Sequence, residues 1–216
     1  MIKAIAFDLD GTLVDSLPDL AWAVNQLRQQ LALAPVTCAQ VSQWIGNGIG
    51  KLVERASADA GSPPQALALF EAAYAGHLVV DSTLRSGAKM LLAALGERQL
   101  PLALVTNKAQ RFAEPLVAGL GLAPFFTHVL YGDSLAAKKP DPLPLHWLCQ
   151  QWQITSAELM LVGDSKNDIA AAKAAGCVGV GLTGGYNYGE DIGLCHPDFV
   201  IDSLPGLLTL PPLQTR

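Results

Sequence analysis

The stretch that most constrains the fold of this chain is residues 5–16, which read IAFDLDGTLVDS. Residues 2–7 are apolar at all positions but one, as a strand buried on both faces requires. Asp8 and Asp10 follow where this strand should end, and Gly11 can adopt the backbone angles of a tight turn. Because ligands of open parallel α/β sheets bind at the carboxyl ends of the strands, the stretch predicts a ligand site there.

The rest of the chain alternates short apolar segments with segments of helical spacing. Further strands are expected at residues 102–105, 128–131, 159–162 and 178–182, with a short edge strand at 199–201. Helices are expected at residues 87–98, 109–120 and 169–175, and after the Asp141-Pro142 pair. Such alternation predicts an α/β fold whose core is a doubly wound, Rossmann-like parallel sheet.

Residues 16–81 are the exception, because no strand pattern appears in them. Their apolar spacing predicts helices at 19–31, 37–44, 51–60 and 64–80, with a glycine-rich break at 46–50. Ser16 is expected to cap the first helix, with Asp19 reaching back as in a capping box. We therefore expect an inserted all-helical cap at residues 16–81 and a discontinuous α/β core formed by residues 1–15 and 82–216.

The composition limits the classes of partner. The chain has 216 residues, of which half are hydrophobic and 15% charged, which is enough for one core domain with an insertion. Its net charge of −5 argues against nucleic acid, so local groups must hold an anionic ligand. Without a bilayer-spanning apolar run or a signal peptide, we expect a cytoplasmic protein with no membrane partner. The four scattered cysteines fit free thiols better than a zinc site or disulfides.

The closely spaced carboxylates of Asp8 and Asp10 repel each other, so the pair requires a cation, a shared proton or water. An oxygen-rich pair suits Mg²⁺, which proteins hold with few carboxylates and often together with a substrate phosphate. Beside such a cation, one aspartate can attack as a nucleophile while the other moves a proton to and from the leaving group. An isolated D-x-D is more often a solvated acidic turn, but the full string is far more specific.

Polar residues also follow the strand expected at residues 102–105. Thr106 and Asn107 carry a hydroxyl and a backbone amide that can bind a phosphoryl oxygen, although the same pair also suits an ordinary turn. Further along, a lysine of the adjacent Lys138 and Lys139 could offset the repulsion of the carboxylate pair and bind phosphate as a point charge. Two adjacent lysines are also consistent with a solvated pair.

A third polar cluster follows the strand expected at residues 159–162. Asp164 and Asp168 are separated by about one helical turn and should lie on one face. They can ligate or support a metal ion, or they can cap the N-terminus of the next helix. For Asp168 both interpretations stay open.

These segments, in this order, resemble the four motifs of phosphatases in the haloacid dehalogenase superfamily. The matching residues are D-L-D-G-T-L-V-D-S at 8–16, Thr106, K-P-D-P at 139–142 and G-D-S-K-N-D at 163–168. The resemblance implies that Asp8 is the nucleophile, Asp10 the general acid and base, and Mg²⁺ the cofactor. The implied metal ligands are Asp8, Asp10 and Asp164. The implied phosphate-binding residues are Thr106, Asn107 and the catalytic Lys139, with Gly11 and Asp168 in support.

The helical insert directly after the first motif resembles the C1-cap subgroup of that superfamily. Residues 184–190 and 196–200 are most similar to bacterial phosphoglycolate phosphatases. One departure is Arg85-Ser86-Gly87, which stands where relatives usually read Y-P-G at the return from the cap. This departure alters the hinge of the cap.

The resemblance implies hydrolysis of a small anionic phosphate ester, with 2-phosphoglycolate first, in carbohydrate metabolism, by a monomer or weak homo-oligomer. The alternatives are a sugar-phosphate phosphatase or a hexose phosphate mutase, which shares the four motifs. Asp10 disfavours dehalogenases and phosphonatases, and a non-catalytic binding protein is disfavoured because no motif carboxylate is missing. The loop at residues 46–50 is either an ordinary turn between helices or a loop that faces the substrate, where Arg55, Lys51 or Arg85 would supply a basic contact.

Overall fold

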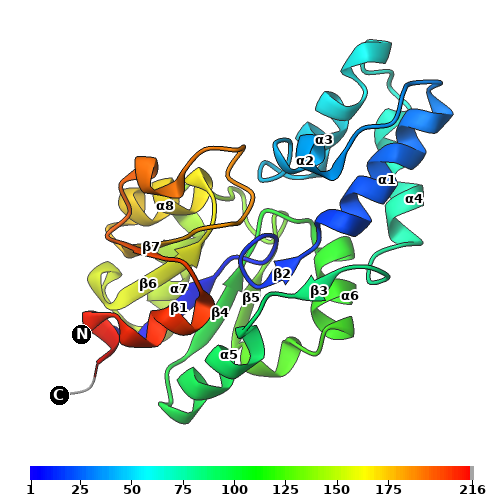
Figure 1. The fold of residues 1–216 in the computed structure, drawn as a ribbon. Coiled ribbons are helices and arrows are strands. Elements are labelled where there is room, and N and C mark those ends of the chain that lie inside the picture. The colour runs from blue at the N-terminus through cyan, green and yellow to red at the C-terminus, as the bar shows by residue number, and fades with distance from the viewer. Residues whose placement is uncertain (215–216) are drawn as a thin grey trace.

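A six-stranded parallel sheet lies at the centre of the larger part of the computed structural model, which describes residues 1–214 (Figure 1). The strands follow in the order β5-β4-β1-β6-β7-β8, so β1 lies between the two halves of the sheet. Their bounds are β1 Ala4–Phe7, β4 Leu102–Val105, β5 His128–Leu130, β6 Leu159–Gly163, β7 Val178–Leu182 and β8 Phe199–Ile201. The predicted parallel sheet, with its short edge strand, is confirmed.

Side chains of β1 alternate between two hydrophobic cores, one on each face of the sheet. Ile5 and Phe7 belong to a core shared with α5 and α6, whereas Ala4 and Ala6 belong to a core shared with α7 and α8. The bounds are α5 Ala88–Glu97, α6 Gln110–Gly119, α7 Leu143–Trp152 and α8 Lys166–Ala175. Because helices cover both faces, the sheet is doubly wound, as the alternating sequence pattern indicates.

The second part of the molecule is a group of helices beside the sheet, at the upper right of Figure 1. Its helices are α1 Leu17–Gln30, α2 Cys38–Ser42, α3 Ile49–Ala56 and α4 Ala66–Ala75. They pack around a hydrophobic core that includes Val24, Leu27 and Phe70 and that Phe112 and Tyr186 of the sheet part also join. We call residues 17–75 the helical insert. The predicted all-helical insertion is present, while the exact limits of cap and core as domains stay a prediction.

A two-stranded antiparallel ribbon connects the insert to the sheet. It consists of β2 (Val14–Asp15) and β3 (Thr83–Leu84). The sequence does not predict this ribbon, because strands of two residues are too short to show an alternating pattern. Short 3-10 helices complete the fold at Ala58–Ala60, Ala123–Phe125, Ser156–Glu158, Ile192–Cys195, Leu204–Thr209 and Pro211–Leu213.

The predicted capping box at the start of α1 is wrong. The Ser16 side chain makes no cap hydrogen bond and donates its hydroxyl hydrogen to Asp10 instead. The buried Asp19 carboxylate accepts hydrogen bonds from the main-chain N–H groups of Asp81 and Ser82, at 2.8 and 2.9 Å, and from the Ser82 hydroxyl at 2.6 Å. Asp19 therefore holds the chain as it returns from the insert.

The helix expected at residues 64–80 is also shorter than predicted, since α4 ends at Ala75. Gly76 caps the helix, and the chain beyond it runs to the Asp19 carboxylate, which binds the N–H groups of Asp81 and Ser82. Apolar residues such as Leu78 continue the helical spacing and misled the sequence interpretation, yet Leu78 packs against the insert from a turn.

The remaining expectations from composition concern cysteines and membranes. Cys38, Cys149, Cys177 and Cys195 are free, and two of them are buried, in line with the prediction of unpaired thiols. Within residues 1–214, no helix combines the length and the hydrophobicity needed to cross a bilayer.

Replacing Asp19 by alanine should destabilise the protein, because it leaves the main-chain N–H groups of Asp81 and the buried Ser82 without an acceptor. We expect Asp19→Ala to lower the free energy of unfolding by about 2–4 kcal/mol. Chemical denaturation of this variant and of Asp202→Ala, an exposed carboxylate, measures the difference. Equal stabilities of the two variants would show that Asp19 does not hold the returning chain.

Candidate active site

Three strand ends bring the predicted polar residues to one edge of the sheet. Asp8 and Asp10 follow β1, Thr106 follows β4 and Asp164 follows β6. Because β1 lies between β4 and β6, these ends meet where the strand order reverses, which is the usual ligand position in such folds. Between this edge and the insert lies a cavity of about 560 Å³, including the part open to solvent. Its wall from the insert is formed by Leu20, Ile45, Gly46, Gly48, Ile49 and Leu52.

Lys139 joins two of the predicted carboxylates. Its buried ammonium group donates hydrogen bonds to Asp8 Oδ1 at 2.7 Å and to Asp168 Oδ1 at 2.6 Å. Burial by itself lowers the pKa of Lys139, but the negative charges of Asp168 and Asp8 outweigh it and raise the pKa above its usual value. Lys139 therefore stays charged and fixes the direction of both carboxylates.

The carboxylates around Lys139 carry more negative charge than the lysine balances. Burial raises the pKa of Asp8 well above its usual value, against the opposing charge of Lys139, and Asp168 and Asp164 raise it further. Burial and the charge of Asp168 raise the pKa of Asp164 to about 6, although hydrogen bonds from Thr12 and the Tyr186 N–H favour its charged form. A divalent cation would relieve this excess.

The same group of oxygen atoms fits Mg²⁺. One carboxylate oxygen from each of Asp8, Asp164 and Asp168 lies within 4.8 Å of the others, and all three residues are buried. A β-carbon on Gly11 would lie 2.2 Å from Asp164 Oδ2, and one on Gly185 would be equally close. Glycine at these positions leaves the room that the carboxylate needs, and hard oxygen donors suit Mg²⁺.

The Asp10 side chain lies apart from that group. Its Oδ1 accepts a hydrogen bond from the Ser16 hydroxyl, and its two oxygens lie 3.0 and 3.3 Å from Lys108 Nζ. Asp10 lines the cavity next to Asp8, so its carboxylate can exchange a proton with a bound molecule. Its ligation of the metal stays a prediction.

Thr106 and Asn107 both line the cavity, and the Asn107 side chain also links two loops. The Asn107 amide donates hydrogen bonds to the carbonyl oxygens of Gly46 at 3.1 Å and Lys139 at 2.8 Å. Among the described residues, the main-chain N–H of Asn107 has no acceptor, so it is available to an anionic ligand. The asparagine side chain thus connects the loop of the insert to the Lys139 loop.

The glycine-rich loop of the insert lies against the site, as the sequence indicates. Gly46 and Gly48 line the cavity, and the Gly46 carbonyl also accepts a hydrogen bond from Asn167 at 3.0 Å. The Tyr188 hydroxyl donates to Asn47 Oδ1. Core residues therefore hold this loop in place.

The basic residues expected to contact the substrate do not line the cavity. Lys51 is exposed and pairs with Glu54, and Arg85 donates a hydrogen bond to the Gly184 carbonyl. Arg55 donates to the Trp44 carbonyl. Within residues 1–214, the cavity wall takes its cationic side chains from Lys139 and Lys108 instead.

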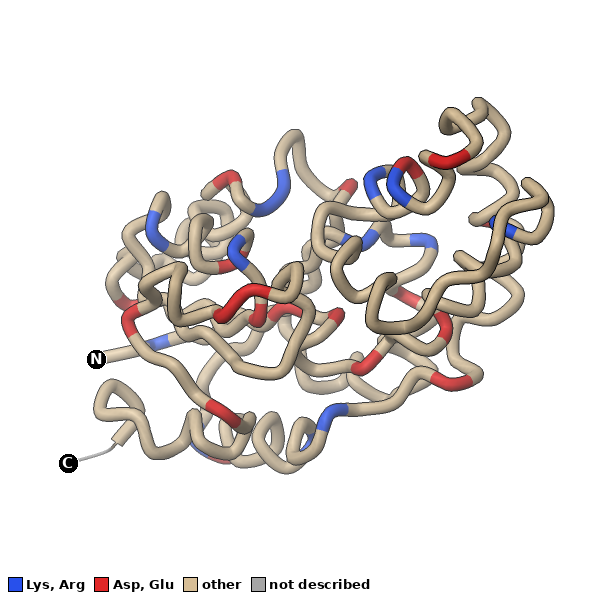
Figure 2. Tube along the Cα trace, turned by 45° about the horizontal axis from the view of Figure 1, so that its top comes forward, with Lys and Arg blue, Asp and Glu red and all other residues tan. Residues whose placement is uncertain are grey.

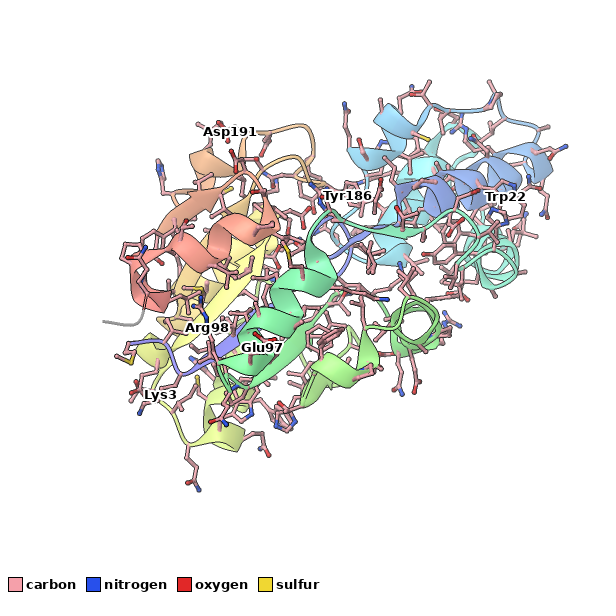
Figure 3. The ribbon with its side chains drawn as sticks, turned by 60° about the horizontal axis from the view of Figure 1, so that its bottom comes forward. Lys3, Trp22, Glu97, Arg98, Tyr186 and Asp191 are labelled. Carbon is pink, nitrogen blue, oxygen red and sulfur yellow. The ribbon has the colours of Figure 1, made fainter. Side chains whose placement is uncertain are left out.

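Two residues of the site escaped the sequence interpretation. Lys108 gave no signal beyond following Thr106 and Asn107. Tyr186 lies in a segment that the sequence analysis noted only for its similarity to related proteins, without a role for this residue. Its hydroxyl donates a hydrogen bond to Asp15 and accepts one from the Leu17 N–H. Figure 3 shows Tyr186 where the sheet meets the insert, and Figure 2 shows acidic positions gathered in the middle of the molecule.

Comparison with known proteins agrees with this geometry. The family model of haloacid dehalogenase-like hydrolases matches residues 2–176. The chain is 44% identical to the phosphoglycolate phosphatase of Photobacterium profundum, covering 96% of this chain and 94% of that protein. It is 46% identical to the phosphoglycolate phosphatase of Vibrio vulnificus strain YJ016, covering 96% of this chain and 95% of that protein.

A solved structure shows the same fold. The crystal structure of a predicted phosphoglycolate phosphatase from Haemophilus somnus matches with a TM-score of 0.89 and 36% sequence identity. The match covers 96% of this chain and 97% of that chain, so it includes both the sheet and the helical insert.

Substituting Gly11 should disturb Mg²⁺ binding, because the added β-carbon would displace the Asp164 carboxylate. We expect Gly11→Ala to lose the rise in unfolding temperature that Mg²⁺ gives to the wild type. Gly61→Ala is a matched control, because Gly61 has a similarly positive φ but open space around it. A full Mg²⁺ response in Gly11→Ala would contradict the role of this close contact.

The Mg²⁺ affinity should depend on pH, because the metal must displace a proton from Asp164, whose pKa is raised to about 6. Below pH 6 we expect the apparent affinity to fall by up to about tenfold per pH unit. In the metal-free protein the raised pKa favours the folded state at pH 4 and below, and this contribution is lost as the pH rises through 6. Calorimetric Mg²⁺ titrations at pH 5 and pH 7 test the first statement, and equal affinities would contradict it.

Proposed function

Since the chain belongs to the haloacid dehalogenase-like hydrolases, we propose that it cleaves a small phosphate monoester through a phosphorylated Asp8, with 2-phosphoglycolate as the first candidate substrate. The chain is a phosphoric monoester hydrolase, and the proposal concerns its mechanism, its metal and its substrate. The observation that carries the proposal is the Asp8 carboxylate, held by Lys139 beside Thr106 on the wall of the cavity.

The first step transfers the phosphoryl group to Asp8. Lys139 holds one oxygen of Asp8, and the other attacks phosphorus while the bond from phosphorus to the ester oxygen breaks. The leaving oxygen takes a proton from Asp10. The Thr106 hydroxyl and the free N–H of Asn107 are placed to bind phosphoryl oxygens, so the protein contributes positioning and charge.

The second step releases phosphate. Asp10, now a carboxylate, takes a proton from a water molecule whose oxygen attacks phosphorus, and the bond from phosphorus to Asp8 breaks. Asp8 and Asp164 would hold Mg²⁺, supported by Asp168, and the bound ion would offset the charge of the transferred group. Each catalytic residue then returns to its starting protonation state.

The names of similar proteins support 2-phosphoglycolate as the substrate. Leu20, Ile45 and Leu52 of the insert line the cavity with apolar side chains. Relatives at 44% and 46% identity are named phosphoglycolate phosphatases. A sugar-phosphate phosphatase or a hexose phosphate mutase is the alternative, because the residues around Asp8 serve those reactions equally well.

Side-by-side specificity constants for 2-phosphoglycolate, a hexose 6-phosphate and pyrophosphate test the substrate. We expect 2-phosphoglycolate to be preferred over the hexose ester by at least about tenfold, since one buried contact can change preference by this much or more. Preference for the hexose ester, or an isomerised product, would refute the substrate assignment and leave the Asp8 chemistry intact.

Asp8→Asn should lower kcat by at least about a thousandfold, because it removes the nucleophile but keeps the shape of the side chain. Chelation of the metal should abolish the phosphatase activity of the wild type, and added Mg²⁺ should restore that activity. Asp202→Asn, a change of an exposed carboxylate, serves as the control and should keep full activity. Near-normal turnover in folded Asp8→Asn would rule out the phosphorylated Asp8.

A further inference from the structure

Lys108 is a buried lysine on the cavity wall that the two steps above do not use. Lys108 is 5% exposed, and its ammonium group lies 3.0 Å from Asp10 Oδ1 and 3.3 Å from Asp10 Oδ2. Asp10 Oδ1 also accepts a hydrogen bond from the hydroxyl of Ser16, which lies directly before α1. Two groups therefore determine where the Asp10 carboxylate points.

The backbone of Lys108 is fixed at both ends. Its N–H donates to Thr106 Oγ1 at 3.1 Å, and its carbonyl accepts a hydrogen bond from the Gly132 N–H at 2.8 Å. The loop packs so tightly here that a β-carbon on Gly132 would lie 2.2 Å from the Asn107 carbonyl oxygen. The lysine side chain thus starts from a rigid point beside the phosphate-binding residues.

The helical insert supplies the surface on which the lysine rests. Lys108 Nζ lies 5.0 Å from the centre of the Tyr74 ring, which comes from α4. That ring is fully buried, and its centre lies 5.5 Å from the Phe70 ring and 5.4 Å from the Phe112 ring. Within the described residues the Tyr74 hydroxyl has no hydrogen-bond partner, and the ammonium group lies over the ring within cation–π distance.

We propose that Lys108 is a positioning residue for proton transfer, which holds the Asp10 carboxylate toward the leaving oxygen and is itself seated by the Tyr74 ring of the insert. The inference rests on the proposed function, since it takes Asp10 as the group that moves the proton. Through Tyr74, the packing of the insert against the sheet sets the geometry of Asp10.

Packing alone does not account for a charged residue at this place. Lys108 lies over the Tyr74 ring of α4, where an apolar side chain of similar length would fill the space without the cost of burying a charge. The ammonium group is directed at one carboxylate, that of Asp10, and lies on the wall of the cavity. Its charge therefore serves the carboxylate.

Three phosphate esters and the variant Lys108→Met test this role. Ethyl phosphate and 2-phosphoglycolate have poor leaving groups that need a proton, whereas p-nitrophenyl phosphate has a good leaving group that does not. We expect kcat/KM of Lys108→Met to fall about 10- to 100-fold on both alkyl esters and less than about threefold on the aryl ester. The value of kcat/KM is used because it reports the step in which the leaving group departs.

A second pair of variants tests the contact between Lys108 and the Tyr74 ring. Tyr74→Leu removes the ring and should reproduce the alkyl-ester defect with a loss of about three- to tenfold, while Tyr74→Phe keeps the ring and should rescue it. Arg111→Met is the matched control, because the Arg111–Glu71 ion pair also joins the sheet part to the insert but does not touch Asp10. Arg111→Met should leave the ratio of alkyl to aryl kcat/KM unchanged.

The results separate this inference from the proposed function. Equal losses of Lys108→Met on all three esters, or no loss on any, would overturn the positioning role. A loss confined to 2-phosphoglycolate would also overturn it, because Lys108 would then contact the substrate carboxylate. A wild-type protein that hydrolyses none of the esters would refute the proposed function itself. Should Lys108→Met fail to fold, the two Tyr74 variants decide the question.

Discussion

The rest of the site depends on the contact of one buried ammonium group, that of Lys139, with the carboxylates of Asp8 and Asp168. The three residues come from the loop before α7, the end of β1 and the first turn of α8, so the contact ties both halves of the sheet together. Removing one partner of such a buried pair typically costs about 3–5 kcal/mol, because a charge is left uncompensated. The same contact orients the Asp8 carboxylate that we propose to attack phosphorus, so one interaction serves both the stability of the core and the proposed chemistry.

The sheet supplies the reacting groups, and the helical insert determines their surroundings. Asn107 and Asn167 hold the Gly46 carbonyl of the insert over the cavity. Tyr74 of the insert also supports Lys108, which binds Asp10, the carboxylate that we propose to transfer the proton. A departure of the insert would therefore open the cavity and loosen that carboxylate at the same time.

Much of the fold was predictable, because strands that are buried on both faces appear in the sequence as apolar runs followed by polar residues. Lys139 was also predictable, since it belongs to a motif. Contacts between distant segments were not predictable. Asp19 was misread as a local cap because its partners lie 62 and 63 positions away. Lys108 carried no local signal, and its importance appears only when Tyr74 of the insert and Asp10 of the sheet meet around it.

The central claim is that Asp8 carries the phosphoryl group during turnover. Mixing the Mg²⁺-loaded protein with 2-phosphoglycolate, quenching in acid within one turnover and analysing the peptides by mass spectrometry tests it directly. We predict that the peptide containing Asp8 gains the mass of one phosphoryl group, that fragmentation assigns the group to Asp8, and that it disappears as substrate is exhausted. Turnover at the normal rate with no phosphorylated Asp8 peptide at any time point would contradict the account.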